Sequence, residues 1–466
     1  MAIPCGLPAP AAAGRSWWRP ALPLALAAVL VYLPLQGLPF LADDYLSLER
    51  PSMWWSLHAT LFRPLDGLLL AAQRAAFGLH PLPYHLLALG LHVAVVLCAW
   101  RLLARLAGGP TALLATLLFL LYPRSIEAVA WISAADNELP YALGVLVALL
   151  LWTAPGPFFR RWRGALVALC YLLALSAKQS AVVLPGAVVL LEAGTGDRGD
   201  GGWREVLIRA RALVRDLWPV GAVFVAYALF TGLQLTLAYH TPGHSQYGLV
   251  RPKELLHYIV EYPILGLLPF ISAHWLQPAR HAVLLAAPVA LLLLRWLRAG
   301  GWRRTGVLWF AVFSLPTLLF APFGPSNEYF YLPALGICLA VAAEVALLRV
   351  PARRRLVTLA VLGAMACTFA GKVSWWREQG SALRTVRGAT LTAARSQPAG
   401  TVLLVGVGQD PPLVFPLMNA LPAMVRVLAP QFRGQVRVMA GGPLLCGGTP
   451  VPVGEGAWVC PAAPPG

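Results

Sequence analysis

The stretch PYHLLALGLHVAVVLCAWRLLA, from Pro83 to Ala104, decides the class of fold. It is almost entirely apolar, and a helix of roughly 20 such residues crosses the hydrocarbon core of a bilayer. Similar stretches recur from Ala21 to Ala370. Overall, 59% of the residues are hydrophobic, 12% are charged, and the mean hydropathy is +0.69. Because a water-soluble fold would have too little polar surface, we predict an all-α polytopic membrane protein.

The basic residues report topology rather than nucleic-acid binding. The formal net charge is +17, but Lys and Arg fall in short clusters between apolar stretches and form no continuous basic face. Cytoplasmic loops of membrane proteins collect such clusters, so one alternation of loops fits best. It places these groups in the cytoplasm: Arg15 and Arg19, Arg101 and Arg105, Arg160 to Arg163, Arg198 to Arg215, Arg295 to Arg304, and Arg349 to Arg355. The N-terminus is then cytoplasmic.

This alternation predicts about 11 transmembrane helices, the first retained because no convincing cleavage site follows it. The expected spans are 21–41, 83–104, 110–122, 139–153, 164–177, 180–193, 217–238, 282–297, 306–321, 330–348 and 356–371. The segment from Glu254 to Phe270 is apolar enough to cross, but a crossing would move the cluster at Arg295 outside. We therefore predict a re-entrant or juxtamembrane helix there and an extracytoplasmic C-terminus.

Three regions follow from this pattern: a cytoplasmic tail (1–20), a transmembrane domain (21–371) and an extracytoplasmic C-terminal segment (372–466). In the last region the apolar density falls. A β-branched run at 401–407, a possible helix at 416–428 and a second possible strand at 435–439 predict a small α/β element. Cys446 and Cys460 would share an oxidising compartment there and could form a disulfide.

An acidic pair, Asp43 and Asp44, follows the first predicted span on the outer side. Two adjacent carboxylates repel each other, which raises the pKa of one and keeps it available as a base near neutral pH. Such a base could deprotonate an acceptor hydroxyl. A solvated acidic pair at a helix end explains the same residues as well.

Three cations lie on the same predicted side. Arg124 could grip a phosphate with its fork, and Glu127, three residues later, could hold that fork or a sugar hydroxyl. Lys178 stands alone between two apolar runs, and Arg63 precedes Pro64; either could neutralise a lipid phosphate. The alternatives are an ordinary Arg124–Glu127 pair and lysine snorkelling to the interface.

A later outer segment, Asn327-Glu328-Tyr329, offers directional hydrogen bonds and an aromatic face for a sugar ring. A helix cap with an interfacial aromatic belt is the alternative. The outer-loop histidines lack metal-ligand spacing, and neither a phosphate-binding glycine motif nor a nucleophile elbow stands out.

Taken in order, these segments resemble the polytopic glycosyltransferase C superfamily. The most similar members are bacterial relatives of transmembrane and tetratricopeptide-repeat O-mannosyltransferases and protein O-mannosyltransferases, although the tetratricopeptide repeats are missing here. The resemblance covers roughly residues 20–350 and rests on order and spacing. The matching segments are DDY (43–45), FRPL (62–65), FGLHPLPYHLL (77–87), YPRSIEAVAWIS (122–133), LSAKQ (175–179) and EYFYLP (328–333).

The resemblance implies a hexosyl- or mannosyltransferase that uses a polyprenyl-phosphate sugar. The acceptor would be a protein or glycan hydroxyl at the outer face of the bacterial inner membrane. Relatives that use lipid-monophosphate sugars generally need no metal, so it implies no cofactor, although oligosaccharyltransferases bind a divalent cation. The implied roles are Asp43 and Asp44 as catalytic bases, Arg63, Arg124 and Lys178 as contacts of the donor phosphate, and Tyr45, Glu127, Asn327, Glu328 and Tyr329 as substrate contacts.

The chain also departs from the pattern of the superfamily. Tyr122 stands where relatives often have His, Gln179 where they often have Glu, and Asn327-Glu328-Tyr329 replaces a common Asp/Glu-Arg-Tyr. These differences leave open the acceptor and a catalytically inactive membrane scaffold. A lipid or solute transporter or flippase is a further alternative, but it would place ionisable residues near mid-span, whereas the candidate groups here concentrate at one predicted face.

Overall fold

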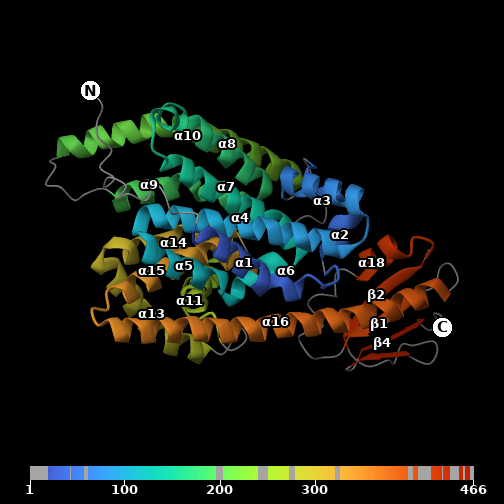
Figure 1. The fold of residues 1–466 in the computed structure, drawn as a ribbon. Helices are drawn as coiled ribbons and strands as arrows, with labels where there is room; N and C mark the ends of the chain where they lie inside the picture. The colour runs from blue at the N-terminus through green and yellow to red at the C-terminus, as the bar shows by residue number, and fades with distance from the viewer. Residues whose placement is uncertain are drawn as a thin grey trace.

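The computed structural model confirms an all-helical polytopic architecture with a small α/β unit near the C-terminus (Figure 1). The structure describes residues 19–41, 43–56, 61–195, 203–239, 250–271, 276, 279–320, 326–396, 402–407, 421–432, 434–440, 451–454 and 457–461. Cys446 lies outside these residues, and with it the predicted disulfide.

Helices make up the membrane part of the chain. Their bounds are α1 Ala21–Tyr32, η1 Leu33–Leu35, α2 Asp43–Glu49, η2 Pro51–Trp54, α3 Pro64–Phe77, α4 Pro81–Ala107, α5 Gly109–Leu120, η3 Pro123–Ile126, α6 Glu127–Ala130, α7 Ile132–Trp152, α8 Pro157–Ala177, η4 Gln179–Val183, α9 Leu184–Thr195, α10 Trp203–Tyr239, α11 Pro252–Leu267, α13 Ala279–Ala299, α14 Gly301–Phe320, η5 Asn327–Phe330, α15 Tyr331–Ala346 and α16 Pro351–Ser396.

Among the described residues, six helices are long and apolar enough to cross a membrane, or up to seven if the bent pair Gly109–Leu120 and Pro123–Ala130 counts as one span. The six are Pro81–Ala107, Ile132–Trp152, Arg211–Gln234, Arg280–Ala299, Asn327–Ala346 and Pro351–Ser396. Of the other predicted spans, three correspond to helices of 12 residues, namely α1, α5 and α9. Two correspond to α8 and α14, which have 21 and 20 residues. The helix α11 has 16 residues, and its re-entrant placement stays a prediction.

The core of the bundle forms around α4, α7 and α15. α4 packs against α5 and α7, α7 packs against α8, and α15 packs against α5 and α14. The outermost helices instead present apolar side chains outward, and Leu229 on α10 is 71% exposed. Apolar surface of this extent is stable only if lipid covers it.

The two ends of the bundle carry different chemistry. At one end, Arg105 donates to the carbonyl of Leu150 at 2.8 Å, and Arg295 pairs with Glu344 at 2.6 Å. Lys178 follows the C-terminal end of α8, whose N-terminal part carries Arg160, Arg161 and Arg163. Glu328 lies just before α15, and Glu344, the partner of Arg295, lies near the C-terminal end of that helix. Basic groups and candidate site residues are thus at opposite ends of these two helices, while the loop topology and the direction of the bundle in the membrane stay predictions.

The C-terminal unit is a four-stranded sheet with one described helix, α18 Leu421–Leu428. The strands β1 Val402–Val407, β2 Gln435–Ala440, β3 Val451–Gly454 and β4 Ala457–Pro461 lie in the order β2-β1-β4-β3. β1 is parallel to β2 and antiparallel to β4. Both predicted strands and the predicted helix are confirmed, and β3 and β4 are additional.

A single helix connects the two parts. α16 has 46 residues, which at 1.5 Å per residue is about 70 Å. A bilayer core takes about 30 Å of that length, so the helix extends well beyond it. The helix continues without a break past residue 371, where the fall in apolar density predicted a domain boundary. It can do so because a helix that leaves the bilayer can continue with a polar surface. The boundary itself stays a prediction.

Candidate active site

The acidic loop, residues 36–41 and 43–49, carries Asp43 and Asp44 between α1 and η2. Asp44 is 1% exposed, and its carboxylate accepts the backbone N–H of Leu41 at 2.6 Å and of Ser133 at 2.7 Å. Burial raises the pKa of Asp44 to about 7, although these two donors oppose the rise. One carboxylate oxygen therefore holds the loop against the start of α7, and the other binds the backbone of the loop itself.

Asp43 differs from its neighbour in being free. It is the first residue of α2, its side chain is exposed, and it makes no hydrogen bond with any residue that the structure describes. Desolvation by the surrounding protein raises the pKa of Asp43, and the nearby charge of Glu328 raises it further. Of the two aspartates, Asp43 has the carboxylate that is available to a ligand.

Lys178 lies just after the end of α8 and is 4% exposed. Its ammonium group forms an ion pair with Glu138 and lies 4.6 Å from the ring centroid of Tyr329. Burial lowers the pKa of Lys178 well below its usual range, and Arg63 lowers it further, whereas Glu328 and Asp66 act in the opposite direction. The lysine is thus a buried cation held by an acid and an aromatic face.

Arg63 stands beside Lys178 at the start of α3. Its Nε donates to Oε1 of Gln179 at 2.9 Å, and its guanidinium lies 5.7 Å from the ring centroid of Trp54. Asp66, one helical turn later, is 2% exposed, and burial raises its pKa to about 7. Two cations and one buried acid therefore share a small volume.

A second cluster joins the start of α6 to the start of η5, just before α15. The Ser326 hydroxyl lies 2.9 Å from Oε1 of Glu127 and 2.7 Å from Oε2 of Glu328. The Asn327 amide also donates to Glu127 at 2.8 Å. One hydroxyl has a single proton to donate, so the two carboxyl groups are held close together around it.

Arg124 lies deeper, and protein groups occupy its guanidinium. It is 5% exposed, its Nε donates to the carbonyl of Leu265 at 3.1 Å, and its terminal nitrogens donate to Asn327 and to the carbonyl of Ile271. These bonds fasten the C-terminal end of α11 to the start of α15. The role of Arg124 as a phosphate contact stays a prediction, and its contacts favour a structural role.

Tyr45 is also part of the packing. It is 1% exposed, its ring meets Phe40 edge-on with centroids 5.9 Å apart, and its hydroxyl lies beside the guanidinium of Arg387. Burial raises the pKa of Tyr45 to about 12. Its role as a substrate contact is likewise untested.

The structure thus links Asp43, Arg63, Lys178, Glu328 and Tyr329 through neighbouring contacts. Glu127 adjoins Glu328 through Ser326, and Asn327 and Arg124 adjoin Glu127 in turn. Sequence reasoning gave no role to Asp66 and Glu138, which neighbour Lys178. The signal that could have found them is an acid within or beside an apolar helix, because such a group is stable only with a partner. Among the described residues, no group of three or more His, Cys, Asp or Glu side chains is arranged to hold a metal ion.

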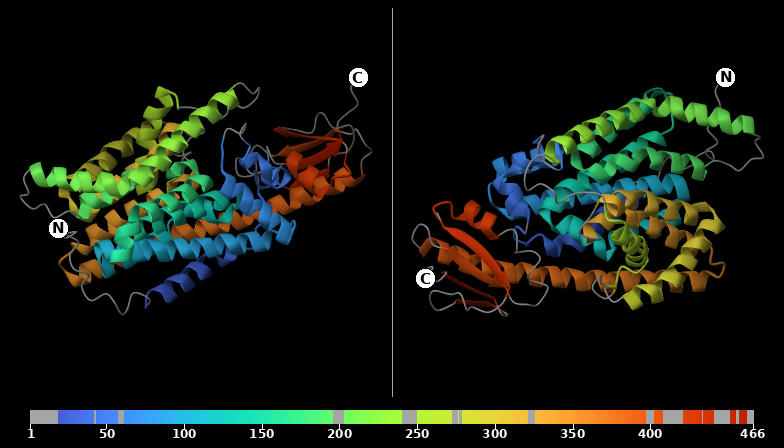
Figure 2. Two further views of the ribbon diagram at one scale, coloured as in Figure 1. Left: turned by 90° about the horizontal axis from the view of Figure 1, so that it is seen from above. Right: turned by 180° about the vertical axis from the view of Figure 1, so that it is seen from behind.

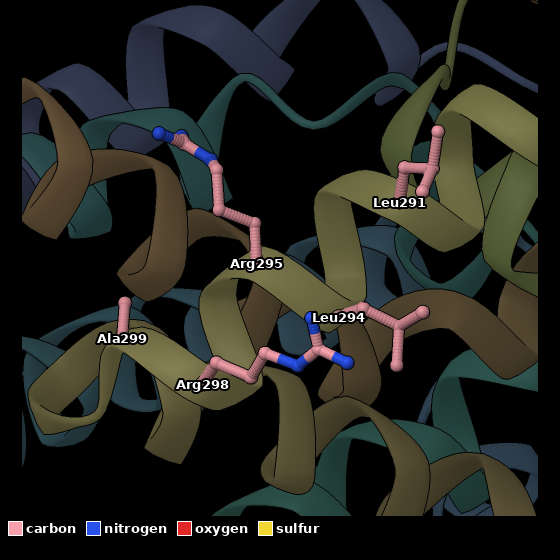
Figure 3. A pocket seen from close by; sticks show the side chains of 5 residues that line it. All are labelled: Leu291, Leu294, Arg295, Arg298 and Ala299. Atoms are coloured by element: carbon pink, nitrogen blue, oxygen red, sulfur yellow. The ribbon is translucent and has the colours of Figure 1, made fainter.

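A cavity of about 510 Å³ lies elsewhere, lined by Leu291, Leu294, Arg295, Arg298 and Ala299, all from α13 (Figure 3). Arg295 pairs with Glu344, which is at the opposite end of α15 from Glu328. This cavity is therefore separate from the candidate site.

Comparison with known proteins identifies a fold. Neither family models nor curated proteins give a match. Among solved structures, the chain is similar to ArnT from Cupriavidus metallidurans bound to undecaprenyl phosphate, with 16% identity and a TM-score of 0.50 over 97% of this chain and 98% of ArnT. The chain therefore shares the overall fold of ArnT.

Proposed function

We propose that this protein is a membrane glycosyltransferase. It takes a sugar, of hexosyl or mannosyl type, from a polyprenyl-phosphate donor and transfers it to an acceptor hydroxyl at the outer surface of the bacterial inner membrane. The observation that carries the proposal is the exposed carboxylate of Asp43 near Glu328, which in turn lies near Lys178, in a chain with the fold of ArnT. The undecaprenyl phosphate bound to ArnT supports the choice of donor.

Lys178 and Arg63 are the proposed contacts of the donor phosphate. Arg63 lowers the pKa of Lys178, so the two cations lie close together. A phosphate dianion is bound more strongly by two adjacent cations than by two cations that lie far apart. An arriving phosphate would compete with Glu138 for the lysine ammonium. Since burial favours neutral lysine, the phosphate would also favour its protonation.

Asp43 is the proposed general base. In the transfer, the acceptor oxygen forms a bond to the anomeric carbon while the bond from that carbon to the phosphate oxygen breaks. The acceptor proton passes to the Asp43 carboxylate, and the phosphate leaves with the electron pair. Lys178 and Arg63 then stabilise the charge that develops on the leaving phosphate. Asp44 acts indirectly, because its two hydrogen bonds hold the acidic loop.

Glu328 and Tyr329 are the proposed contacts of the sugar. Glu328 raises the pKa of both Asp43 and Lys178, so it is close to the proposed base and to the proposed phosphate site. A sugar that joins the phosphate to the acceptor would occupy this same region.

Lipid analysis and a transfer assay test the proposal together. The protein, purified in native membrane discs, is extracted and its lipids are identified by mass spectrometry; we expect an isoprenoid phosphate. A panel of radiolabelled undecaprenyl-phosphate hexoses is then supplied with a membrane protein and glycan extract. Absence of both the lipid and any protein-dependent consumption of the donors would contradict the proposal.

A further inference from the structure

The C-terminal segment contacts the acidic loop directly. In Figure 1, α18 lies beside α2, and both views of Figure 2 place the sheet at the end of the bundle where α2 and α3 lie. The segment far along the chain therefore reaches the loop that carries Asp43. The following contacts between described residues define this interface.

The first contact is a paired hydrogen bond between Arg426 on α18 and Glu49 at the end of α2. Arg426 Nε lies 2.6 Å from one carboxylate oxygen and Nη2 lies 2.9 Å from the other. The guanidinium holds the pKa of Glu49 below its usual value. An isolated surface ion pair contributes little, but a fork that binds both oxygens also fixes orientation.

The remaining contacts come from successive turns of α16. Arg384 donates to the carbonyl of Gly37 at 3.0 Å, which holds the opposite end of the loop. Gly380 lies against Leu38 so closely that an added Cβ would be 2.6 Å from a methyl of that leucine. Arg387 lies beside the hydroxyl of Tyr45. α16 and α18 thus contact both ends of the loop and its middle.

The transmembrane helices hold the other side of the same loop. Ser133 donates to Asp44, His85 lies 3.0 Å from the carbonyl of Leu38, and Arg74 donates to the carbonyl of Leu48. The loop is therefore held between two structural units, while the Asp43 side chain is exposed and makes no hydrogen bond with a described residue.

We propose that the C-terminal segment is a positioning element for the base, in which Arg426 and Arg384 hold the two ends of the acidic loop so that Asp43 faces the acceptor. This inference rests on the proposed function, since positioning matters only if Asp43 takes a proton. Arg426 and Arg384 touch neither substrate nor reacting atoms in this scheme; they are positioning residues.

A charge swap in the full-length protein tests the proposal. The variants are Arg426→Glu, Glu49→Arg and the double variant, with Arg384→Met as a second probe. Arg395→Glu is the matched control, because Arg395 is exposed on the same segment and makes no hydrogen bond or ion pair with a described residue. Two quantities are measured: hydrogen exchange of the peptide spanning residues 36–49, and the kcat and KM for the polyprenyl-phosphate sugar.

We expect each single variant to raise exchange in this peptide and to lower kcat about tenfold or more with little change in the donor KM, because a small misplacement of a catalytic group is costly. The double variant should restore both quantities toward the values of the natural protein, and Arg395→Glu should change neither. Single variants with unaltered exchange and kcat, or a double variant no better than the single ones, would overturn the proposal. Failure of the proposed function can be told apart from failure of this proposal. In that case the natural protein would show no sugar transfer, while hydrogen exchange of residues 36–49 would still show whether Arg426 and Arg384 hold the loop.

Discussion

Lys178 forms a buried ion pair with Glu138, and the ring of Tyr329 lies over its ammonium group at 4.6 Å. The three residues come from α7, η5 and the junction after α8, so this contact ties distant parts of the chain together at the candidate site. It also sets up the first prediction, because a buried pair cannot lose one member cheaply.

Replacing Lys178 by Met should destabilise the protein by about 3–5 kcal/mol, because Glu138 would remain buried without its partner. The double variant Lys178→Met/Glu138→Gln should recover most of this stability but should still bind the donor poorly. Thermal unfolding and the donor KM, measured on both variants, separate the two effects. Full recovery of donor binding in the double variant would argue against a phosphate contact at Lys178.

Substitution of Asp43 and substitution of Asp44 should affect activity and stability differently. Asp43→Asn should lower kcat by about 10²–10⁴, the range typical of a lost general base, without changing the unfolding temperature. Asp44→Asn leaves one backbone donor poorly paired and should cost about 1–3 kcal/mol of stability as well as activity. Transfer rates and melting curves are compared with those of Asp216→Asn, at a site on α10. Equal turnover of Asp43→Asn and the natural protein would exclude Asp43 as the base.

The pH dependence of kcat/KM should be bell-shaped and narrow. The rate rises with pH as Asp43 ionises, and its raised pKa moves this limb to higher pH than for an ordinary aspartate. The rate falls as Lys178 loses its proton, and its lowered pKa moves that limb to lower pH than for an ordinary lysine.

Arg124 should matter more for stability than for donor affinity. Its nitrogens donate to two carbonyls and one amide oxygen, so Arg124→Met would strand these acceptors and cost about 2–3 kcal/mol. Melting temperature and donor KM measured on the same sample decide the point. A large rise in KM with unaltered melting would restore the original assignment of Arg124 to the phosphate.

Transfer should continue after chelation of divalent cations. The phosphate charge in this scheme is met by Lys178 and Arg63, so EDTA should leave the rate unchanged within a factor of about two. The rate is measured with EDTA, and again after Mg²⁺ or Mn²⁺ is added back. Loss with EDTA and recovery with either ion would show that a metal takes part.

The sequence by itself determined that the helices need a lipid environment, and it assigned the basic clusters and the candidate site residues to opposite ends of the helix bundle. Apolar stretches such as Pro83–Ala104 require lipid around them. Each spanning helix joins one side of the membrane to the other, so the alternation of loops assigns the basic clusters to one side and the polar segments at Asp43, Lys178 and Asn327 to the other. The strands near residues 402 and 435 could also be predicted from the sequence, since β-branched runs in a polar segment favour β-strands.

Only the tertiary structure decided which of those polar groups are free. Asp43 and Asp44 are neighbours in the chain, yet the backbone N–H groups of Leu41 and Ser133 bind one of them, and the other stays exposed. Arg124 donates hydrogen bonds to backbone carbonyls, and Arg426 donates to Glu49, which is 377 positions earlier in the chain. Local sequence cannot encode these partners, because a hydrogen bond depends on where distant backbone segments meet, and packing of the whole bundle sets that meeting point.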